Sequence, residues 1–201
     1  MIFQRDYVLR MIEMMGEFVR KVCSLARDAD ALAELNEASR RGCGMPLDML
    51  GAAEPDTLAA LLEEPQRLFG AELLLLRARV ESRTHTDDAL LPLRSQAVRL
   101  LGTLTETDFM TRACELTCQI LHDALDALDA DSLLAAAGLC ERAGRFDRAE
   151  DAWFALLERD GARAGEVARF YDRLEALPDA ALAQGGLPRA ELAEGRASLA
   201  R

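Results

Sequence analysis

From about residue 65 onward, apolar residues recur at helical spacing, and short polar breaks separate one run from the next. Steps of three and four residues place apolar side chains on one face of a helix. The composition agrees, because Ala and Leu supply 35 residues each whereas Val and Ile together supply 9. Unbranched side chains lose little rotamer freedom in helices, and β-branched ones favour strands. The sequence therefore predicts an all-α protein and argues against a β-barrel, a β-sandwich and a parallel-sheet nucleotide fold.

The pattern divides the chain into three parts. Residues 1–41 are predicted to form a long amphipathic N-terminal helix, with a break expected near Asp28. Residues 42–65 form a linker with short helices, and residues 66–201 form the main helical body, whose last dozen residues are expected to fray. Short breaks between helices predict antiparallel neighbours. In the body we expect helices at 66–83, 87–103, 107–128, 132–143, 147–159 and 162–176, with weaker ones near 178–184 and 188–199.

The N-terminal helix carries a heptad-like apolar pattern over about three repeats. Val8, Met11, Met15 and Phe18 begin this pattern, at alternating steps of three and four residues. A second apolar row widens the stripe, which favours packing within the same domain. The alternative is a homodimer that forms through these same four residues.

The charge of the chain restricts its partners. The formal net charge is −11, and all of this excess lies in residues 42–201. No basic stripe is present to neutralise phosphates, so we expect neither nucleic-acid binding nor attachment to anionic membranes. The apolar runs are too short to span a bilayer, and charged residues interrupt any secretory signal. Five cysteines, an odd number at irregular spacing, predict free thiols in a reducing cytoplasm.

Residues 133–157 carry a more specific pattern. Gly144 predicts a turn, and the small side chains of Ala137 and Ala149 allow two helix backbones to approach each other. Trp153 supplies a large aromatic group to fill the space between hairpins. This segment resembles a tetratricopeptide repeat. The resemblance implies antiparallel helical hairpins that stack as a short array.

Three short segments carry a second resemblance, which extends over most of the chain up to about residue 160. They are residues 4–12, residues 44–47 and residues 144–151. In the order of these segments the chain resembles a family of uncharacterised bacterial proteins with a domain of unknown function. The resemblance implies a tetratricopeptide-like helical fold. It implies no known activity and therefore no catalytic residues.

One predicted helix carries three groups that bind soft metals. Cys114, Cys118 and His122 follow one another at intervals of four residues. A zinc site needs three or four ligands that converge on one ion, but these three span about 12 Å along a helix axis. We therefore interpret them as buried thiols at a helix interface and predict no metal site. A thiol catalyst built from Cys118 and His122 has no third, orienting group in the sequence.

A run of acidic residues follows this helix. Asp123, Asp126, Asp129 and Asp131 lack the Gly at the sixth position and the Glu at the twelfth that a calcium-binding EF-hand loop needs. We interpret them as a solvated face that ends in the cap of the next helix. The sequence also lacks a glycine-rich phosphate loop, a Ser-His-Asp set and an HExxH motif. It therefore predicts no catalytic residues and no cofactor.

These observations favour a non-enzymatic scaffold that binds a protein or peptide in a helical groove. In tetratricopeptide repeats the ligand-facing positions lie on the first helix of each hairpin. Leu134, Gly138, Glu141 and Arg142 occupy that face here and are the candidate groove residues. Two alternatives remain: a structural protein that self-assembles as a homodimer through the N-terminal helix, and a helical-bundle enzyme with an unrecognised site.

Overall fold

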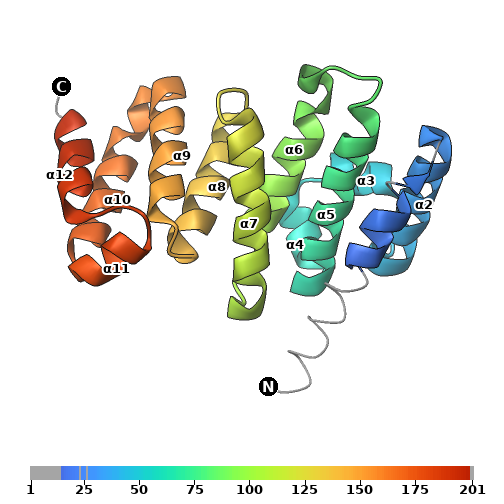
Figure 1. Cartoon of the computed structure of the whole chain (residues 1–201), viewed down its shortest axis with the longest axis horizontal. Helices are drawn as coiled ribbons and strands as arrows, with labels where there is room; N and C mark the ends of the chain where they lie inside the picture. The colour runs from blue at the N-terminus through green and yellow to red at the C-terminus, as the bar shows by residue number, and fades with distance from the viewer. Residues whose placement is uncertain (1–14, 23, 26, 200–201) are drawn as a thin grey trace.

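A computed structural model describes residues 15–22, 24–25 and 27–199 of the chain, and the prediction of an all-α fold is confirmed for these residues (Figure 1). Within this part of the chain no helix has both the length and the apolar character needed to cross a membrane. The helices after residue 27 are α2 (Asp28–Cys43), α3 (Leu47–Ala52), α4 (Pro55–Leu61), α5 (Glu64–Glu81), α6 (Asp87–Gly102), α7 (Thr107–Ala124), α8 (Ala130–Arg142), α9 (Phe146–Arg159), the 3₁₀ turn Gly161–Arg163, α10 (Ala164–Glu175), α11 (Asp179–Gln184) and α12 (Arg189–Ser198).

The N-terminal part of the chain contains two helical segments. Residues 15–22 are helical, and α2 begins separately at Asp28, so the expected long helix is interrupted where a break was expected. Met15 is 3 % exposed and Phe18 packs against the core, so both contact their own chain. Val8 and Met11, the other residues of the predicted dimer seam, lie outside the described residues. The two seam residues that the structure describes therefore favour packing within the chain.

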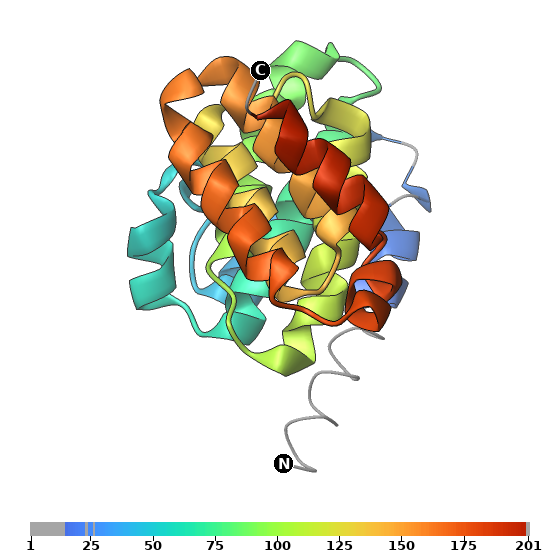
Figure 2. The ribbon, with the colours of Figure 1, turned by 90° about the vertical axis from the view of Figure 1, so that its left-hand side faces the viewer.

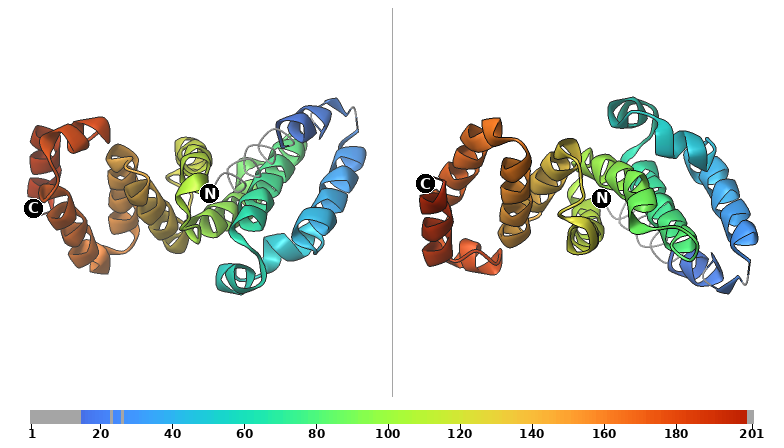
Figure 3. Two further views of the ribbon diagram at one scale, coloured as in Figure 1. Left: turned by 90° about the horizontal axis from the view of Figure 1, so that it is seen from below. Right: turned by 90° about the horizontal axis from the view of Figure 1, so that it is seen from above.

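The longer helices stand side by side along the long axis, from α2 at one end to α12 at the other (Figure 1). Helix α5 packs between α2 and α6, and α6 also contacts α8. Helix α7 contacts α5, α6, α8 and α9. Seen from above and below, the row is bent and α7 stands on one side of it (Figure 3). The result is an elongated array whose two halves meet at α6, α7 and α8.

Helices α8 and α9 form a hairpin around small buried side chains. Ala137 and Ala149 are fully buried, as the sequence pattern predicts for a close approach of two helices. Gly144 adopts the left-handed conformation, with φ of 72°, in the turn between them. The ring of Trp153 packs 6.3 Å from that of Phe170 and so joins α9 to α10.

The end of the chain is packed onto the array. Leu182, Leu187 and Leu192 are each 2 % exposed or less. The N–H of Asp147 donates a hydrogen bond to the carbonyl of Gly185, at 3.1 Å, which ties the C-terminal segment to the start of α9. The last dozen residues, which the sequence expected to fray, continue α12 as far as Ser198, and Leu192 of this helix is buried. In the end-on view, α10, α11 and α12 cover the end of the molecule (Figure 2).

Several helix ends differ from the predicted ranges, and the start of α8 has a local reason. Helix α8 begins at Ala130 because the carboxylate of Asp129 accepts a hydrogen bond from the N–H of Ser132, at 2.8 Å. Asp129 is therefore the cap of this helix, which begins two residues before its predicted start at residue 132. Helix α7 ends at Ala124, four residues before its predicted end.

Candidate functional site

A groove of about 530 Å³ runs between α5 and α7. The helical residues 15–22 contribute to one wall, and α6 adds a single side chain. Leu75, Leu116 and Ile120 give the groove an apolar lining. The remaining lining residues are Met15, Val19, Glu72, Leu76, Ala78, Arg79, Ser82, Arg94, Arg112, Gln119 and Asp123.

A partly buried ion pair joins the two helices that form the groove. The Nε of Arg112 on α7 lies 2.6 Å from Oε1 of Glu72 on α5, whose side chain is 8 % exposed. Burial raises the pKa of Glu72, although the charge of Arg112 acts in the opposite direction. Arg112 also pairs with the exposed Glu115 at 3.3 Å. The pair therefore fixes the spacing of α5 and α7 and leaves little free charge on Arg112.

Another arginine of the groove is free to bind a ligand. Arg79 is exposed, and its guanidinium makes no ion pair with any described residue. Arg94, in contrast, pairs with Asp87 at 3.0 Å. A carboxylate from a ligand in the groove would therefore find its partner in Arg79.

Three cysteines gather on the side of α7 that faces α8. Cys114 and Cys118 lie one turn apart on α7, and Cys140 comes from α8. Their three Sγ atoms lie within 4.8 Å of one another, and those of Cys114 and Cys118 are 3.9 Å apart. His122, which the sequence placed with the two α7 cysteines, is exposed and does not belong to this group. We call Cys114, Cys118 and Cys140 the thiol cluster.

The surroundings shift the pKa values of the cysteines in the thiol cluster in different directions. Hydrogen bonds from the thiols of Cys114 and Cys140 lower the pKa of Cys118, and the positive charges of Arg145 and Arg148 act in the same direction against the effect of burial. Interactions with the thiols of Cys114 and Cys118 raise the pKa of Cys140, and its full burial acts in the same direction. The partly exposed Cys118 is therefore the cysteine of the group whose surroundings most favour the thiolate form.

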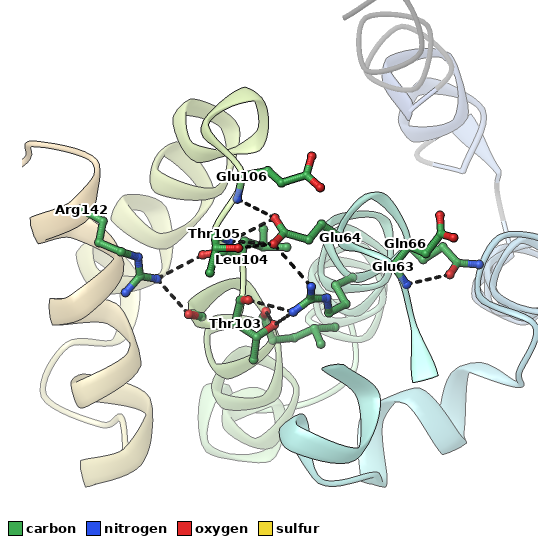
Figure 4. A network of polar contacts seen from close by, with 11 residues as sticks. Glu63, Glu64, Gln66, Thr103, Leu104, Thr105, Glu106 and Arg142 are labelled. Atoms are coloured by element: carbon green, nitrogen blue, oxygen red, sulfur yellow. Dashed lines mark hydrogen bonds and ion pairs between the residues drawn. The ribbon is translucent and has the colours of Figure 1, made fainter. Parts of the chain in front are cut away.

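A network of polar contacts holds the N-terminus of α7 against α5 (Figure 4). The buried carboxylate of Glu64 on α5 accepts hydrogen bonds from the N–H groups of Thr105, at 3.0 Å, and Glu106, at 2.8 Å. The Thr105 hydroxyl also donates to it. Arg67 donates to the carbonyl and to the hydroxyl oxygen of Thr103, both at 2.8 Å. A negative charge at this position also interacts favourably with the N-terminal end of α7.

The same network extends to α8. Arg142 donates to the carbonyls of Gly102, at 2.9 Å, and Leu104, at 3.3 Å (Figure 4). These carbonyls lie at the end of α6 and in the turn that leads to α7, so one side chain of α8 fixes both. Helices α7 and α8 also carry the thiol cluster, so this network helps to hold together the two helices on which its sulfur atoms lie.

The four candidate groove residues of α8 lie away from the groove between α5 and α7. Two of them bind other helices, since Arg142 holds the α6–α7 turn and Glu141 accepts hydrogen bonds from Arg173 of α10 at 2.6 and 2.8 Å. Leu134 packs against the core, and Gly138 is partly buried. None of these four residues lines the groove between α5 and α7.

The model of a "Family of unknown function (DUF6483)" matches residues 2–201. The chain belongs to this family. Searches of curated proteins and of solved structures found no match. The chain's resemblance to a family of unknown function is therefore confirmed for almost the whole length of this DUF6483 member.

In this DUF6483 protein the sequence analysis missed Cys140 as a neighbour of the α7 cysteines. A signal was present in the spacing of the helices. The turn between α7 and α8 is centred on residue 127, and Cys114 and Cys140 each lie thirteen residues from that centre. Consecutive helices joined by a short turn place such positions side by side. The groove left no comparable signal, because its residues come from segments that are distant in sequence.

Proposed function

We propose that this chain is a non-enzymatic scaffold that binds a peptide segment of another protein in the groove between α5 and α7. The groove itself is the observation that supports the proposal. It combines apolar side chains with charged groups at its edge, which is the usual character of a recognition site. The elongated row of helices also resembles the stacked hairpins of a tetratricopeptide array, a type of fold that presents such surfaces.

The groove defines the chemistry of the partner. Leu75 and the edges of Leu116 and Ile120 would contact apolar side chains of the bound segment. Arg79 would pair with a carboxylate, because it has no partner among the described residues. We therefore expect an amphipathic peptide with apolar residues at helical or alternating spacing and at least one acidic residue beside them.

Selection from a displayed library of random peptides tests this proposal. We expect the selected peptides to be rich in apolar and acidic residues. Their affinity for Arg79→Glu and for Gln119→Glu should fall at least about tenfold, because each change places a negative charge at the edge of the groove. Arg169→Glu is the matched control, since Arg169 is exposed on α10 and distant from the groove.

The proposal fails if no peptide is enriched over an unrelated protein of similar charge. It also fails if the selected peptides bind the two groove variants as tightly as the parent chain. Circular dichroism of each variant shows whether the fold is retained, and all three substituted side chains are exposed.

A further inference from the structure

The three Sγ atoms of the thiol cluster have the spacing of ligands around one metal ion. Sulfurs at about 2.3 Å from a central ion in a trigonal plane lie about 4.0 Å from one another. The 3.9 Å separation of Cys114 and Cys118 already meets this value, and every pair lies within 4.8 Å. Side-chain shifts of less than about 1 Å would therefore bring the three sulfurs onto one ion.

The number of ligands favours a soft ion of low coordination number. Structural zinc sites are almost always tetrahedral and use four protein ligands. Within the described part of the chain, no other Cys, His, Asp or Glu joins these three groups. Thiolates alone, in a three-ligand set, suit Cu(I) better than they suit zinc.

The surroundings also suit a charged thiolate complex. Cys114 and Cys140 are 5 % exposed or less, which keeps water from the ion, and the partly exposed Cys118 leaves a path for its entry. Arg145 and Arg148 lie close enough for their positive charges to act on Cys118. Three thiolates and one Cu(I) carry a net charge of −2, which these two guanidinium groups would attract, although Arg145 also pairs with Asp147 and Arg148 with Asp151.

We propose that Cys114, Cys118 and Cys140 form a three-coordinate binding site for Cu(I). Each cysteine binds as a thiolate and releases to solvent any proton that it carried, and neither sulfur nor copper changes oxidation state. The site does not depend on the proposed function, because the groove uses the opposite side of α7.

The test is a titration of the reduced full-length chain with Cu(I), without oxygen and in the presence of a chromogenic Cu(I) chelator as competitor. We expect one equivalent of copper to remain with the protein. X-ray absorption at the copper edge should show three sulfur neighbours at one distance. The melting temperature should rise on binding, because the ion binds the folded state.

Single serine substitutions assign the ligands. We expect Cys114→Ser, Cys118→Ser and Cys140→Ser each to lower the affinity for Cu(I) about a hundredfold or more. Cys43→Ser is the matched control, because Cys43 is also a buried free thiol but belongs to α2 and lies outside the cluster. Cys118→Ser carries the most weight, since this partly exposed position tolerates a hydroxyl better than the fully buried Cys140 does.

Three results would overturn the proposal. The first is retention of copper by Cys118→Ser, folded by circular dichroism, with the affinity of the parent chain. The second is one tightly held equivalent of zinc together with no competition for Cu(I). The third is a reduced chain that gives up all of its copper to the chelator and forms a disulfide between two of the three cysteines in air, which would assign the cluster to thiol oxidation.

Discussion

Glu64 shows how one buried side chain can organise several elements. Burial alone would raise its pKa, but hydrogen bonds from the Thr105 hydroxyl and from the backbone N–H groups of Glu106 and Thr105, together with the charge of Arg67, lower it below the ordinary value. The folded state thus prefers the ionised carboxylate. Its contribution to stability is complete above the ordinary carboxyl pKa and is lost as the pH falls through the lowered value.

We expect Glu64→Gln to lower the free energy of unfolding at neutral pH by about 1–3 kcal/mol, because an amide cannot replace a carboxylate that accepts several hydrogen bonds. The difference between the variant and the parent chain should shrink as the pH falls below about 4. Urea unfolding followed by circular dichroism at a series of pH values measures this difference. Glu158→Gln is the control, because Glu158 is exposed on α9. A difference that stays constant with pH would contradict the argument.

Single residues could be predicted only where their signal is local. The sequence predicted Cys114 and Cys118 as buried thiols of one helix, and Cys114 is buried whereas Cys118 is partly exposed. It did not predict the role of Glu64, because the groups that bind this carboxylate lie about forty residues further along the chain. Contacts of this kind depend on which helices become neighbours, and apolar periodicity does not encode that choice.

At the scale of the helices, α6 and α8 approach each other closely in the middle of the array. A Cβ atom on Gly102, at the end of α6, would lie 2.8 Å from the Cβ of Ala135 and 3.3 Å from its Cα. Two backbones therefore meet at a position where only hydrogen fits. The carbonyl of Gly102 also accepts a hydrogen bond from Arg142 of α8, so the same point is held by both packing and polar contact.

We expect Gly102→Ala to lower the free energy of unfolding by about 1–3 kcal/mol, because α6 and α8 must separate to admit the methyl group. Gly165→Ala is the matched control, since nothing lies within 4 Å of a Cβ at this position of α10. That substitution should leave stability unchanged or raise it by about 0.5–1 kcal/mol. Denaturant titration measures the free energy of unfolding of both variants. Equal effects would show that the space at Gly102 does not limit the packing of α6 against α8.

The helices themselves were largely predictable from the sequence. Their order and approximate bounds in residues 66–199 follow from apolar spacing and from breaks such as Gly144. The errors lie at helix ends, where a single cap such as Asp129 moves a boundary by two residues. The burial of the C-terminal helices was not predicted, because Leu187 and Leu192 stand among glycine, proline and charged residues and give only a weak apolar pattern.

At the scale of the whole molecule, stability is distributed along a row. Each helix contacts mainly its neighbours, as in repeat proteins, where stability is approximately a sum of local and nearest-neighbour contributions. Helices α10 to α12 close one end of the row. The side chain of Leu192, on α12, is buried at this end. A destabilising substitution at this end should therefore lower the stability of the nearby helices only.

We expect Leu192→Asp to lower the stability of the C-terminal end by roughly 3 kcal/mol, because an unpaired charge replaces a buried apolar side chain. Hydrogen exchange should then speed up in α10, α11 and α12 while α5 and α6 keep the protection of the parent chain. Ala193→Asp is the control, since the neighbouring Ala193 is exposed. Uniform loss of protection along the whole chain would show that the row unfolds as one cooperative unit.

Helix α7 connects the two halves of the array. It stands to one side of the row and touches α5 and α6 in one half and α8 and α9 in the other (Figure 3). A change in the angle between the halves would pivot on the close approach of α6 and α8, and α7 would have to slide along both halves at once. Motions of this kind proceed by small shear steps between packed helices. The molecule is thus braced at its middle, because any change of its curvature has to move α7 against both halves.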